Sequence, residues 1–600
     1  MSAYRRSANI EKESIMGEYN FNVNLGGMID ILSNHLYSTP KVFLRELLQN
    51  AVDAVSLRKN IDKNYDSPEI NVFVETGRSL RFRDNGCGLT EEEIHKFISV
   101  IGESSKRSDS GAFIGRFGIG LLSCFIVTDE ITLRTRSAKQ PDKVHEWHGF
   151  SDGRYSVSEI KSDMDVGTEI EIIAAEPYAE LFTFDEVLEN IKYYGLPIPY
   201  PVYVSSEDNF KARANILLGA FKGDEHKNTL EMGRRIFGVD YDFLDFIPLV
   251  SKKGLFSGAA YILPYAQSAA SANKHRIYLK NMLLTEDGSS ILPEWAFFVK
   301  CFFDTDKLRP TASREDFYKD DLLTEAREEI SQCISSYLER LSIRDPSFLN
   351  RIVSLHGTAL KSIASENDRL FDIFMPYFNF ETSLGVLSGA ELYHYRNTVF
   401  YTSDIDAFRQ LRPVFAEKDE LLVNTCYDYE RALIEKLGET ERAHVEQLSK
   451  TLLEDMLEDV KDEENFKFML DAFSSALAEF DCRTQIKSYS PEQLAAIYSI
   501  NADGEIKRDI GSAKETANDM FAEMLENFEK EIDSEASAAL YLNSKNPLIQ
   551  RLSELSDTDK LSVYARIMYV QSLIAGGFPI RAAEMNIMNE NLIKLIEWGI

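Results

Sequence analysis

Near the start of the chain, a carboxylate, an amide and a second carboxylate recur at helical spacing. The stretch FLRELLQNAVDAV, residues 43–55, holds Glu46, Asn50 and Asp53 among leucines, valines and alanines. At 3.6 residues per turn, these three side chains share one face of a predicted helix. A buried carboxylate without a partner is costly, so a purely structural core face would not carry them. The spacing therefore indicates either a polar stripe on an exposed helix or a ligand site.

Two glycine-containing stretches further along favour the ligand site. RDNGCGL places Asp84, Gly86 and Gly88 directly after a predicted strand. The glycines let the backbone approach a flat ligand closely, and the aspartate can accept a hydrogen bond from an amine. IGRFGIGLLS, residues 114–123, has the spacing G-x-x-G-x-G before a helical run, which suits a phosphate. Each stretch alone is also compatible with a plain turn, and the chain has neither the Rossmann spacing nor a P-loop.

Helical and strand patterns alternate over residues 20–175, which predicts an α+β domain with helices on one side of a sheet. Strands are expected at INVFVE, LRFRD, EITLRTRS and TEIEIIA, and helices over 25–60 and at EEEIHKFISVI. Further α/β patterns cover 255–340 and 380–440, and from about 445 onward the pattern is almost all helical. The fold class is therefore a multidomain α+β and α/β chain.

The composition argues against several classes of protein. The formal net charge of −31 disfavours a large nucleic-acid surface, because phosphates would be repelled. No apolar run approaches the roughly 20 residues of a membrane helix, and the N-terminus has no signal-peptide core. The six cysteines are scattered without a CxxC pair, which fits a reducing cytosol. We therefore expect a cytoplasmic protein with no nucleic acid or membrane as partner.

In order, the stretches above resemble the nucleotide-binding boxes of the GHKL ATPase superfamily, and Gly167-Thr168 in VGTEIEI resembles the fourth box. The flanking text, HLYSTPKVFLRELLQNAVDA and IGRFGIGLLSCFIVTDEITLRTRS, is similar to the heat shock protein 90 family of the bacterial type. The resemblance continues in HRIYLKNMLL and FFDTDKLRPTASREDF, and it returns in YLNSKNPLIQRLSEL. It thus covers most of the chain.

This resemblance implies three domains and a set of ligands and partners. Residues 1–205 would form a Bergerat-type GHKL ATP-binding domain, an α/β sandwich. Residues 225–450 would form an α/β middle domain with client contacts, and residues 455–600 a mostly helical dimerisation domain. The implied ligands are ATP and Mg²⁺. The implied activity is that of an ATP-dependent chaperone, a homodimer that acts on unfolded or partly folded client proteins.

The resemblance also implies roles for single residues. Asn50 would hold the Mg²⁺, Asp84 would recognise the adenine amine, and Glu46 would orient or deprotonate the attacking water. Arg314 would reach the γ-phosphate from the middle domain, although it could also be a surface ion pair. Lys106 could equally be a solvated loop lysine. The remaining expected nucleotide-binding residues are Asp53, Gly86, Gly88, Leu89, Lys106, Gly115, Phe117, Gly118, Ile119, Gly120, Leu121 and Thr168.

The last two predicted helices carry apolar faces. DKLSVYARIMYVQSLIAGG aligns an apolar face that ends at Gly576-Gly577. Its members are Leu561, Tyr564, Ile567, Met568 and Ile574. The second helix carries Met585, Met588, Leu592, Leu595 and Ile596. Two such helices from each of two chains could form a four-helix dimer interface, and the alternative is core within one chain.

Some features depart from the family pattern. The segment between Gly102 and Gly115 is short, and Leu89 and Leu121 replace a frequent Met and a frequent aromatic residue. These departures bear on how the lid closes and how fast hydrolysis runs. Two alternatives stay open: another GHKL enzyme, such as a kinase or a DNA-linked ATPase, and a nucleotide-binding scaffold. A kinase would need a phospho-accepting histidine before the boxes, and His35 stands too close to the first one.

Overall fold

The computed structural model describes residues 39–97, 120–216, 225–268, 270, 273–311, 315–448, 453, 457–500, 502–516, 525 and 538–599. The chain divides into two compact units, and the division falls within helix α6 (Asp321–Arg344). Unit one extends to Pro264 and resumes over Ala270–Ile334, and unit two comprises Tyr265–Ala269 and Ser335–Ile600. Each unit is a mixture of sheets and helices, which confirms the predicted multidomain α+β class. The predicted three-domain boundaries stay a prediction.

Unit one is built on an eight-stranded sheet with the order β5-β4-β3-β6-β2-β1-β7-β8. All neighbouring strands are antiparallel except β1 and β7, which are parallel. The strands are β1 (Ile70–Glu75), β2 (Ser79–Asp84), β3 (Glu130–Arg136), β4 (Val144–Phe150), β5 (Tyr155–Ile160), β6 (Gly167–Ile173), β7 (Val202–Ser206) and β8 (Lys211–Arg213). The four strands expected from the sequence are β1, β2, β3 and β6.

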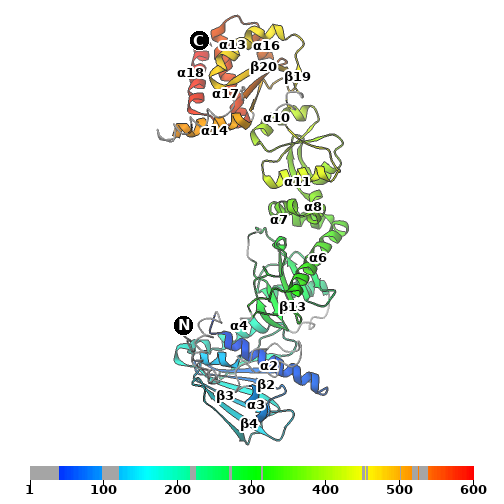
Figure 1. Cartoon of the computed structure of the whole chain (residues 1–600), viewed down its shortest axis with the longest axis vertical. Coiled ribbons are helices and arrows are strands. Elements are labelled where there is room, and N and C mark those ends of the chain that lie inside the picture. Colours follow the sequence, from blue (N-terminus) through cyan, green and yellow to red (C-terminus); the bar gives the residue numbers. More distant parts are fainter. Residues whose placement is uncertain are drawn as a thin grey trace, which may run out of the picture. The chain divides into compact units, whose positions relative to one another are not determined.

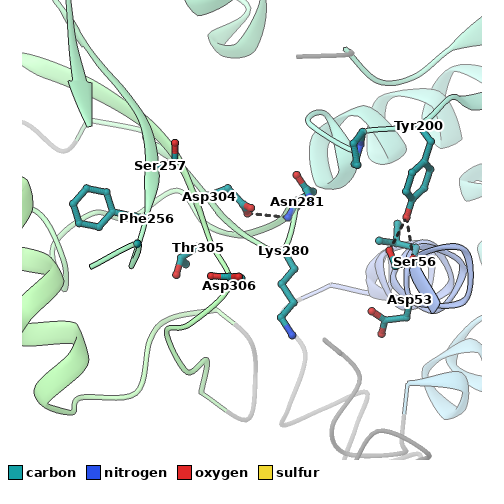
Figure 2. A pocket seen from close by; sticks show the side chains of 13 residues that line it. Asp53, Ser56, Tyr200, Phe256, Ser257, Lys280, Asn281, Asp304, Thr305 and Asp306 are labelled. Atoms are coloured by element: carbon teal, nitrogen blue, oxygen red, sulfur yellow. Dashed lines mark hydrogen bonds between the residues drawn. The ribbon is translucent and has the colours of Figure 1, made fainter. Parts of the chain in front are cut away.

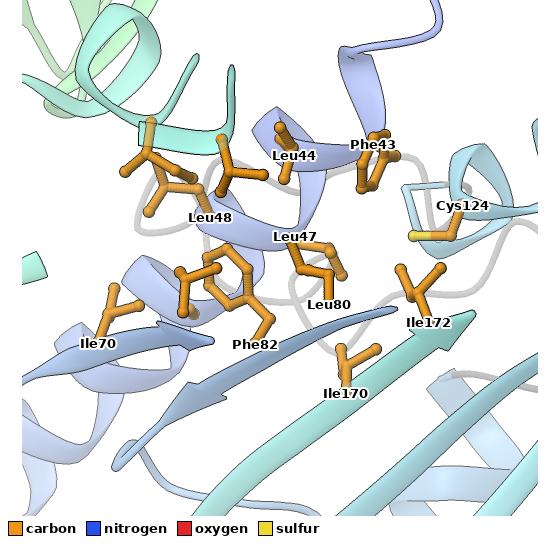
Figure 3. Packing of buried hydrophobic residues seen from close by; sticks show 14 of the residues in the cluster. Phe43, Leu44, Leu47, Leu48, Ile70, Leu80, Phe82, Cys124, Ile170 and Ile172 are labelled. Carbon is orange, nitrogen blue, oxygen red and sulfur yellow. The ribbon is translucent and has the colours of Figure 1, made fainter. Parts of the chain in front are cut away.

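Helices α2 (Val42–Ile61) and α4 (Phe184–Gly195) cover one face of this sheet (Figure 1). Leu44, Leu47 and Leu48 of α2 pack onto inward side chains of β2 and β6, among them Phe82 and Ile172 (Figure 3). Each of these leucines is at most 1% exposed, and burying one contributes about 1.5–3 kcal/mol. The leucine face of α2 therefore fixes the height and rotation of the helix above the sheet.

Three short helices complete this part of unit one: α3 (Glu91–Phe97) and the 3₁₀ helices η2 (Leu121–Ile126) and η3 (Glu176–Leu181). A capping box starts α3, because the Thr90 hydroxyl accepts from the Glu93 N–H and the Glu93 carboxylate accepts from the Thr90 N–H. The helical run that the sequence predicted after Gly120 is η2, which is a 3₁₀ helix rather than an α-helix.

A second sheet of unit one has the order β12-β11-β13-β10-β9. Its strands are β9 (Phe246–Val250), β10 (Ser257–Ile262), β11 (Arg276–Leu279), β12 (Met282–Thr285) and β13 (Val299–Thr305), accompanied by α5 (Glu225–Phe237) and η4 (Glu294–Ala296). The stretch HRIYLKNMLL therefore holds two strands, joined by a turn in which Lys280 and Asn281 have φ of 51° and 64°. Met282 of β12 is buried in the same hydrophobic cluster as α2, so the two sheets share apolar packing.

Unit two begins with a sheet of order β15-β14-β17-β16-β18. Its strands are β14 (Asn379–Thr382), β15 (Gly385–Ser388), β16 (Val399–Thr402), β17 (Leu421–Asn424) and β18 (Val445–Gln447). Its helices are α7 (Pro346–Glu366), α8 (Asp368–Phe374), η5 (Met375–Tyr377), α9 (Gly389–Tyr393), α10 (Ile405–Glu417) and α11 (Asp428–Glu439). The strands expected at NTVFYTS and ELLVN are β16 and β17.

The last part of unit two contains helices and a sheet of order β19-β20-β22-β21. The strands are β19 (Glu458–Asp459), β20 (Cys482–Ser488), β21 (Ala496–Ile500) and β22 (Ala538–Asn543). The helices are η6 (Glu463–Phe466), α13 (Lys467–Leu477), η7 (Ala478–Phe480), α14 (Ala502–Thr516), α16 (Pro547–Ser553), α17 (Thr558–Gly576) and α18 (Ala582–Gly599). The expectation of an almost wholly helical pattern from 445 onward missed this sheet.

A buried carboxylate fixes the start of α18. Glu584 is fully buried, and its Oε1 accepts hydrogen bonds from Arg508 of α14 at 2.9 Å and from Tyr569 of α17 at 3.0 Å. Arg581 adds a third hydrogen bond at 2.6 Å. Burial raises the pKa of Glu584, but the hydrogen bonds from Arg581 and Arg508 outweigh it and hold the pKa below its ordinary value.

Within the part of the chain that the structure describes, no helix is long and apolar enough to cross a membrane.

Candidate nucleotide-binding site

The polar face predicted for α2 is present and largely enclosed. Glu46 is 2% exposed and Asp53 is 4% exposed, while Asn50 is half-buried on the same helix. A purely exposed polar stripe is therefore wrong for this helix. Buried carboxylates need compensating partners, so their presence on a helix that also supplies the core marks a built site.

Asp84 reaches this site because of the strand period. Side chains of β2 alternate, and the inward face that carries Leu80 and Phe82 also carries Asp84 at the end of the strand. The Asp84 Oδ1 accepts a hydrogen bond from the Gly86 N–H at 2.8 Å, and the Thr168 N–H also donates to this carboxylate. Burial raises the pKa of Asp84 to about 7, against the effect of these two hydrogen bonds. A carboxylate in this state gains from a ligand amine that donates to it.

Glycines bring backbone segments together around Asp84. A Cβ at Gly86 would lie 2.5 Å from the carbonyl carbon of Ala54 in α2. A Cβ at Gly88, where φ is +61°, would lie 2.0 Å from the Arg136 carbonyl oxygen. At Gly167 it would lie 2.1 Å from the Asp84 carbonyl oxygen. Only glycine permits these approaches, so the second and fourth predicted boxes are packed against α2 and against each other.

Gly120 likewise makes a close approach that a larger residue would prevent, in this case to the buried Glu46 of α2. A Cβ at Gly120 would lie 2.6 Å from the Glu46 Oε2. The last glycine of the G-x-x-G-x-G stretch therefore lies directly against Glu46, and a larger residue there would displace the carboxylate. Leu89 and Leu121 are half-buried and pack on the hydrophobic core beside these turns.

Thr135 of β3 connects the boxes and was missed by the sequence reasoning. Its hydroxyl accepts a hydrogen bond from the Leu89 N–H at 2.9 Å and donates to the Gly167 carbonyl at 3.1 Å. The Thr168 hydroxyl lies 3.2 Å from the Thr135 hydroxyl. The strand register explains this position, since Thr135 pairs with Thr168 and Thr168 pairs with Asp84. Thr135 is fully buried, so each of these contacts is shielded from water.

Arg58, near the end of α2, holds the same turns from the other side. Its Nη1 donates to the Asn85 carbonyl at 2.7 Å and to the Val166 carbonyl at 3.3 Å. The Cys87 N–H in turn donates to the Ala54 carbonyl at 3.2 Å. The segment after β2 is therefore tied to α2 by hydrogen bonds as well as by close packing.

A cavity of about 520 Å³ adjoins α2 at Asp53 (Figure 2). Its other wall comes from the second sheet of unit one, including Lys280, Asp304 and Asp306. Figure 2 shows Lys280 extending into the space between the second sheet and α2, while Tyr200 donates to the Val52 carbonyl at 2.9 Å. Asp53 thus faces a cavity that neither Asp84 nor the glycines of the predicted boxes line. Its predicted role as a nucleotide-binding residue stays a prediction.

The structure places Glu46 beside Gly120, and Asp84 beside Gly86 and Thr168, while Gly88 packs against β3 and Asn50 lies on α2 between the two groups; Leu89 and Leu121 pack on the adjoining core. Other predicted site residues lie outside the described residues: Lys106, Gly115, Phe117, Gly118, Ile119 and Arg314. For the metal, no group of three or more His, Cys, Asp or Glu side chains within the described ranges is arranged to hold an ion. The amide oxygen of Asn50 is a donor of the kind that Mg²⁺ accepts.

Comparisons with known proteins agree with this geometry. Residues 37–164 match the sequence family described as "Histidine kinase-, DNA gyrase B-, and HSP90-like ATPase". The chaperone protein HtpG of Borreliella afzelii (strain PKo) is 23% identical, with 96% of this chain and 99% of that protein covered. HtpG of Helicobacter pylori (strain ATCC 700392 / 26695) is also 23% identical, over 92% of this chain and 95% of its own length. HtpG of Chlorobaculum tepidum is 26% identical over 62% of this chain and 63% of its own length.

The matched residues 37–164 include Asp84, Gly86, Gly88, Gly120 and Thr135, and the HtpG relatives extend the likeness into both units. The resemblance predicted from the sequence is thereby confirmed. The chain is therefore similar to the bacterial HtpG chaperones along most of its length, and residues 37–164 match an ATPase family that includes HSP90-like proteins.

Proposed function

We propose that this protein is an ATP-dependent molecular chaperone, a homodimeric clamp that binds and hydrolyses ATP while it acts on unfolded or partly folded proteins. One observation carries the nucleotide part of the proposal: a buried Asp84 framed by glycine turns, beside a helix that buries Glu46. The chaperone part rests on the HtpG relatives, which align along nearly the whole chain. The six cysteines of this protein are all free thiols, and this supports the expected cytoplasmic location.

The residues of unit one divide the work at this site. Asp84 would accept the adenine amine, with Thr168 and the Gly86 and Gly88 turns around the base. Asn50 would hold Mg²⁺, which when bound neutralises charge on the phosphates. Glu46 would orient the attacking water or take its proton, since a buried carboxylate beside a desolvated phosphate suits that task. Gly120 leaves room for this carboxylate.

Arg314 is proposed as the cation that reaches the terminal phosphate. The first described residue after it, Glu315, lies close enough to Tyr194 to raise the pKa of that tyrosine, and so does Glu46. Glu315 and Glu46 therefore both lie near Tyr194. An arginine delivered to a transferring phosphoryl group can accelerate the reaction by about 10³-fold or more.

Helix α18 is proposed as the main dimer contact. Leu592, Ile593, Ile596 and Trp598 are each 45–56% exposed. Apolar side chains gathered on one exposed helix mark an interaction surface. The predicted contribution of α17 needs revision, because Leu561 and Met568 are buried in the core of unit two. These two residues of α17 therefore belong to the core within one chain and not to a dimer interface.

The test compares Glu46→Ala and Arg314→Ala with the unchanged full-length chain. We expect Glu46→Ala to lose ATP turnover while its affinity for ATP, measured by calorimetry, stays within about twofold, since a base contributes about 10²–10⁴-fold to rate. Arg314→Ala should slow turnover without a comparable loss of affinity. Glu91→Ala, at an exposed position of α3, is the control and should match the unchanged chain. Unchanged turnover in Glu46→Ala would remove Glu46 from the mechanism.

A further inference from the structure

The end of helix α4 joins the two hydrophobic cores of unit one. Tyr194 packs against the core beneath α2 and also against the core of the second sheet. Gly195 is enclosed as well, because a Cβ there would lie 2.6 Å from Leu48 of α2. Tyr194 thus belongs to the packing that connects the two sheets, together with Met282 of β12.

Two arginines from opposite sides stack on neighbouring tyrosines at this junction. The Arg45 guanidinium of α2 lies 5.9 Å from the ring centre of Tyr194. The Arg276 guanidinium of β11 lies 5.0 Å from the ring centre of Tyr193. The two tyrosine rings meet edge to face, with centres 5.0 Å apart and planes at 80°. The contact therefore runs from α2 through both rings to the second sheet.

Each end of this contact is fixed by further interactions. Arg276 forms an ion pair of 2.6 Å with Glu286, and both side chains are about four-fifths buried. Arg45 is 7% exposed, and it directly precedes Glu46 in α2. Buried, partnered arginines hold one orientation, because any rotation would leave the charge without compensation.

Charged side chains from both parts of unit one act on Tyr194. Burial is the main reason that the pKa of Tyr194 is raised, and the Arg45 guanidinium counteracts it. The carboxylates of Glu315 and Glu46 raise the pKa further. Glu315 belongs to the second part of unit one and Glu46 to the first, so Tyr194 lies near both.

We propose that Tyr194 is a positioning residue for ATP hydrolysis: its ring holds Arg45, and with it Glu46, at a fixed place relative to the second sheet and the segment at Glu315. This inference rests on the proposed ATPase function and goes beyond it by naming the side chain that sets this distance. Tyr194 contacts neither nucleotide nor water in this role. It acts by restricting where the start of α2 can lie.

In this proposal the aromatic ring of Tyr194 holds Arg45 and the hydroxyl does not, so substitutions that separate ring from hydroxyl test it. Tyr194→Ala removes the ring and its packing between the two cores. Tyr194→Phe keeps the ring and the stacking with Arg45, and it removes only the hydroxyl. Tyr194→Leu fills much of the volume without a ring face, so it serves if the alanine variant does not fold. Tyr178→Ala is the matched control, because Tyr178 packs against the first core alone.

ATP turnover and calorimetric ATP affinity are measured on the full-length chain. Tyr194→Ala and Tyr194→Leu should lower kcat by on the order of 10–100-fold, because misplacement by about 1 Å can cost that much, with affinity within about twofold. Tyr194→Phe should retain most of the turnover, and Tyr178→Ala should match the unchanged chain. Combined with Arg314→Ala, the loss from Tyr194→Ala should not multiply, since residues acting as a unit are non-additive.

The outcomes separate this inference from the proposed function. If the unchanged chain turns over ATP and both Tyr194→Ala and Tyr194→Leu do so equally fast, Tyr194 has no positioning role and the ATPase proposal stands. Fully multiplicative losses with Arg314→Ala, or a Tyr194→Phe variant as slow as Tyr194→Ala, also overturn the ring-based assignment. If the unchanged chain neither binds nor hydrolyses ATP, the proposed function fails and this inference fails with it.

Discussion

The buried Asp84 carboxylate lowers the stability of the folded protein at neutral pH, and replacing it with asparagine tests by how much. Burial raises its pKa from 3.8 to about 7. The shift of about three units corresponds to about 4 kcal/mol at 1.36 kcal/mol per unit. The unfolded chain releases this proton near pH 3.8, whereas the folded chain keeps it until about pH 7. Between these values the folded state binds more protons, so this carboxyl lowers stability progressively as pH rises, up to a plateau above about pH 7.

Asp84→Asn cannot ionise and therefore escapes this penalty. The amide oxygen can keep one of the two backbone hydrogen bonds that Asp84 accepts, and losing the other costs about 1–3 kcal/mol. At pH 5 the avoided penalty is only about 1.6 kcal/mol, similar to the cost of the lost hydrogen bond, so the variant and the unchanged chain should be about equally stable. At pH 8 it should be more stable, by about 1–3 kcal/mol, because the avoided penalty of about 4 kcal/mol outweighs the lost hydrogen bond.

The same substitution should weaken nucleotide binding. A hydrogen bond to a charged group contributes about 1.5–3 kcal/mol, so ATP and ADP affinity should fall by roughly 10- to 150-fold at pH 8. In the unchanged chain, affinity should fall as pH drops through about 7, because protonation removes the charged acceptor. Stability and binding are thus predicted to change in opposite directions at pH 8.

Urea unfolding followed by tryptophan fluorescence, together with calorimetry at pH 5, 6, 7 and 8, measures both effects on the full-length chain. Asp304→Asn is the matched control, because burial raises the pKa of Asp304 to about 6 in the second sheet. It should also gain stability relative to the unchanged chain between pH 5 and pH 8, by a smaller amount because its pKa is raised less, with unchanged nucleotide affinity. An Asp84→Asn variant that is destabilised equally at every pH, with full affinity for ATP, would refute the reasoning.

Three further predictions concern other parts of the chain. Thr135→Val should lower the free energy of unfolding by about 1–3 kcal/mol in urea titrations, because a buried N–H of the site loses its acceptor, whereas Thr132→Val on the opposite sheet face should have a smaller effect. Ile596→Asp in α18 should lower the dimer fraction seen by light scattering and slow ATP turnover, while Lys594→Ala should do neither; an undiminished dimer would remove α18 from the interface. Glu584→Gln should lower the midpoint of urea unfolding at pH 7, since breaking a buried ion pair costs about 3–5 kcal/mol. Because the folded pKa of Glu584 is depressed, its stabilisation is present above about pH 4.5 and lost as pH falls further, and only the unchanged chain should show that acid loss.

Several elements could be read from local sequence because their residues alone determine them. The α2 pattern of leucines with Glu46, Asn50 and Asp53 needs only the helical period. Likewise, the strand period before Asp84 and the glycines after it predict a turn that approaches a ligand. Gly577, with φ of 82°, ends α17 where the sequence placed the end. Each of these depends on neighbours within a few residues.

Other features could not be read because their partners are distant in the chain. Strand β5 is an edge strand with mostly exposed residues, so its alternation is weak. Strands β20 and β22 pair in parallel although about fifty residues and α14 separate them, and β20 has little apolar signal because most of its residues are polar. The apolar face of α17 was compatible with a dimer contact or an intrachain core, because periodicity shows that a face is buried without showing against what.

The sequence by itself determined the chemistry available near α2: which carboxylates, amide and glycines stand at spacings that suit a nucleotide, and which family they resemble. Only the tertiary structure decided how they meet. Strand register places Thr135 between Leu89 and Thr168, and the end of α4 places Tyr194 between two cores. The physical reason is that register and packing are set by contacts between segments far apart in the chain, which no local pattern of residue types encodes.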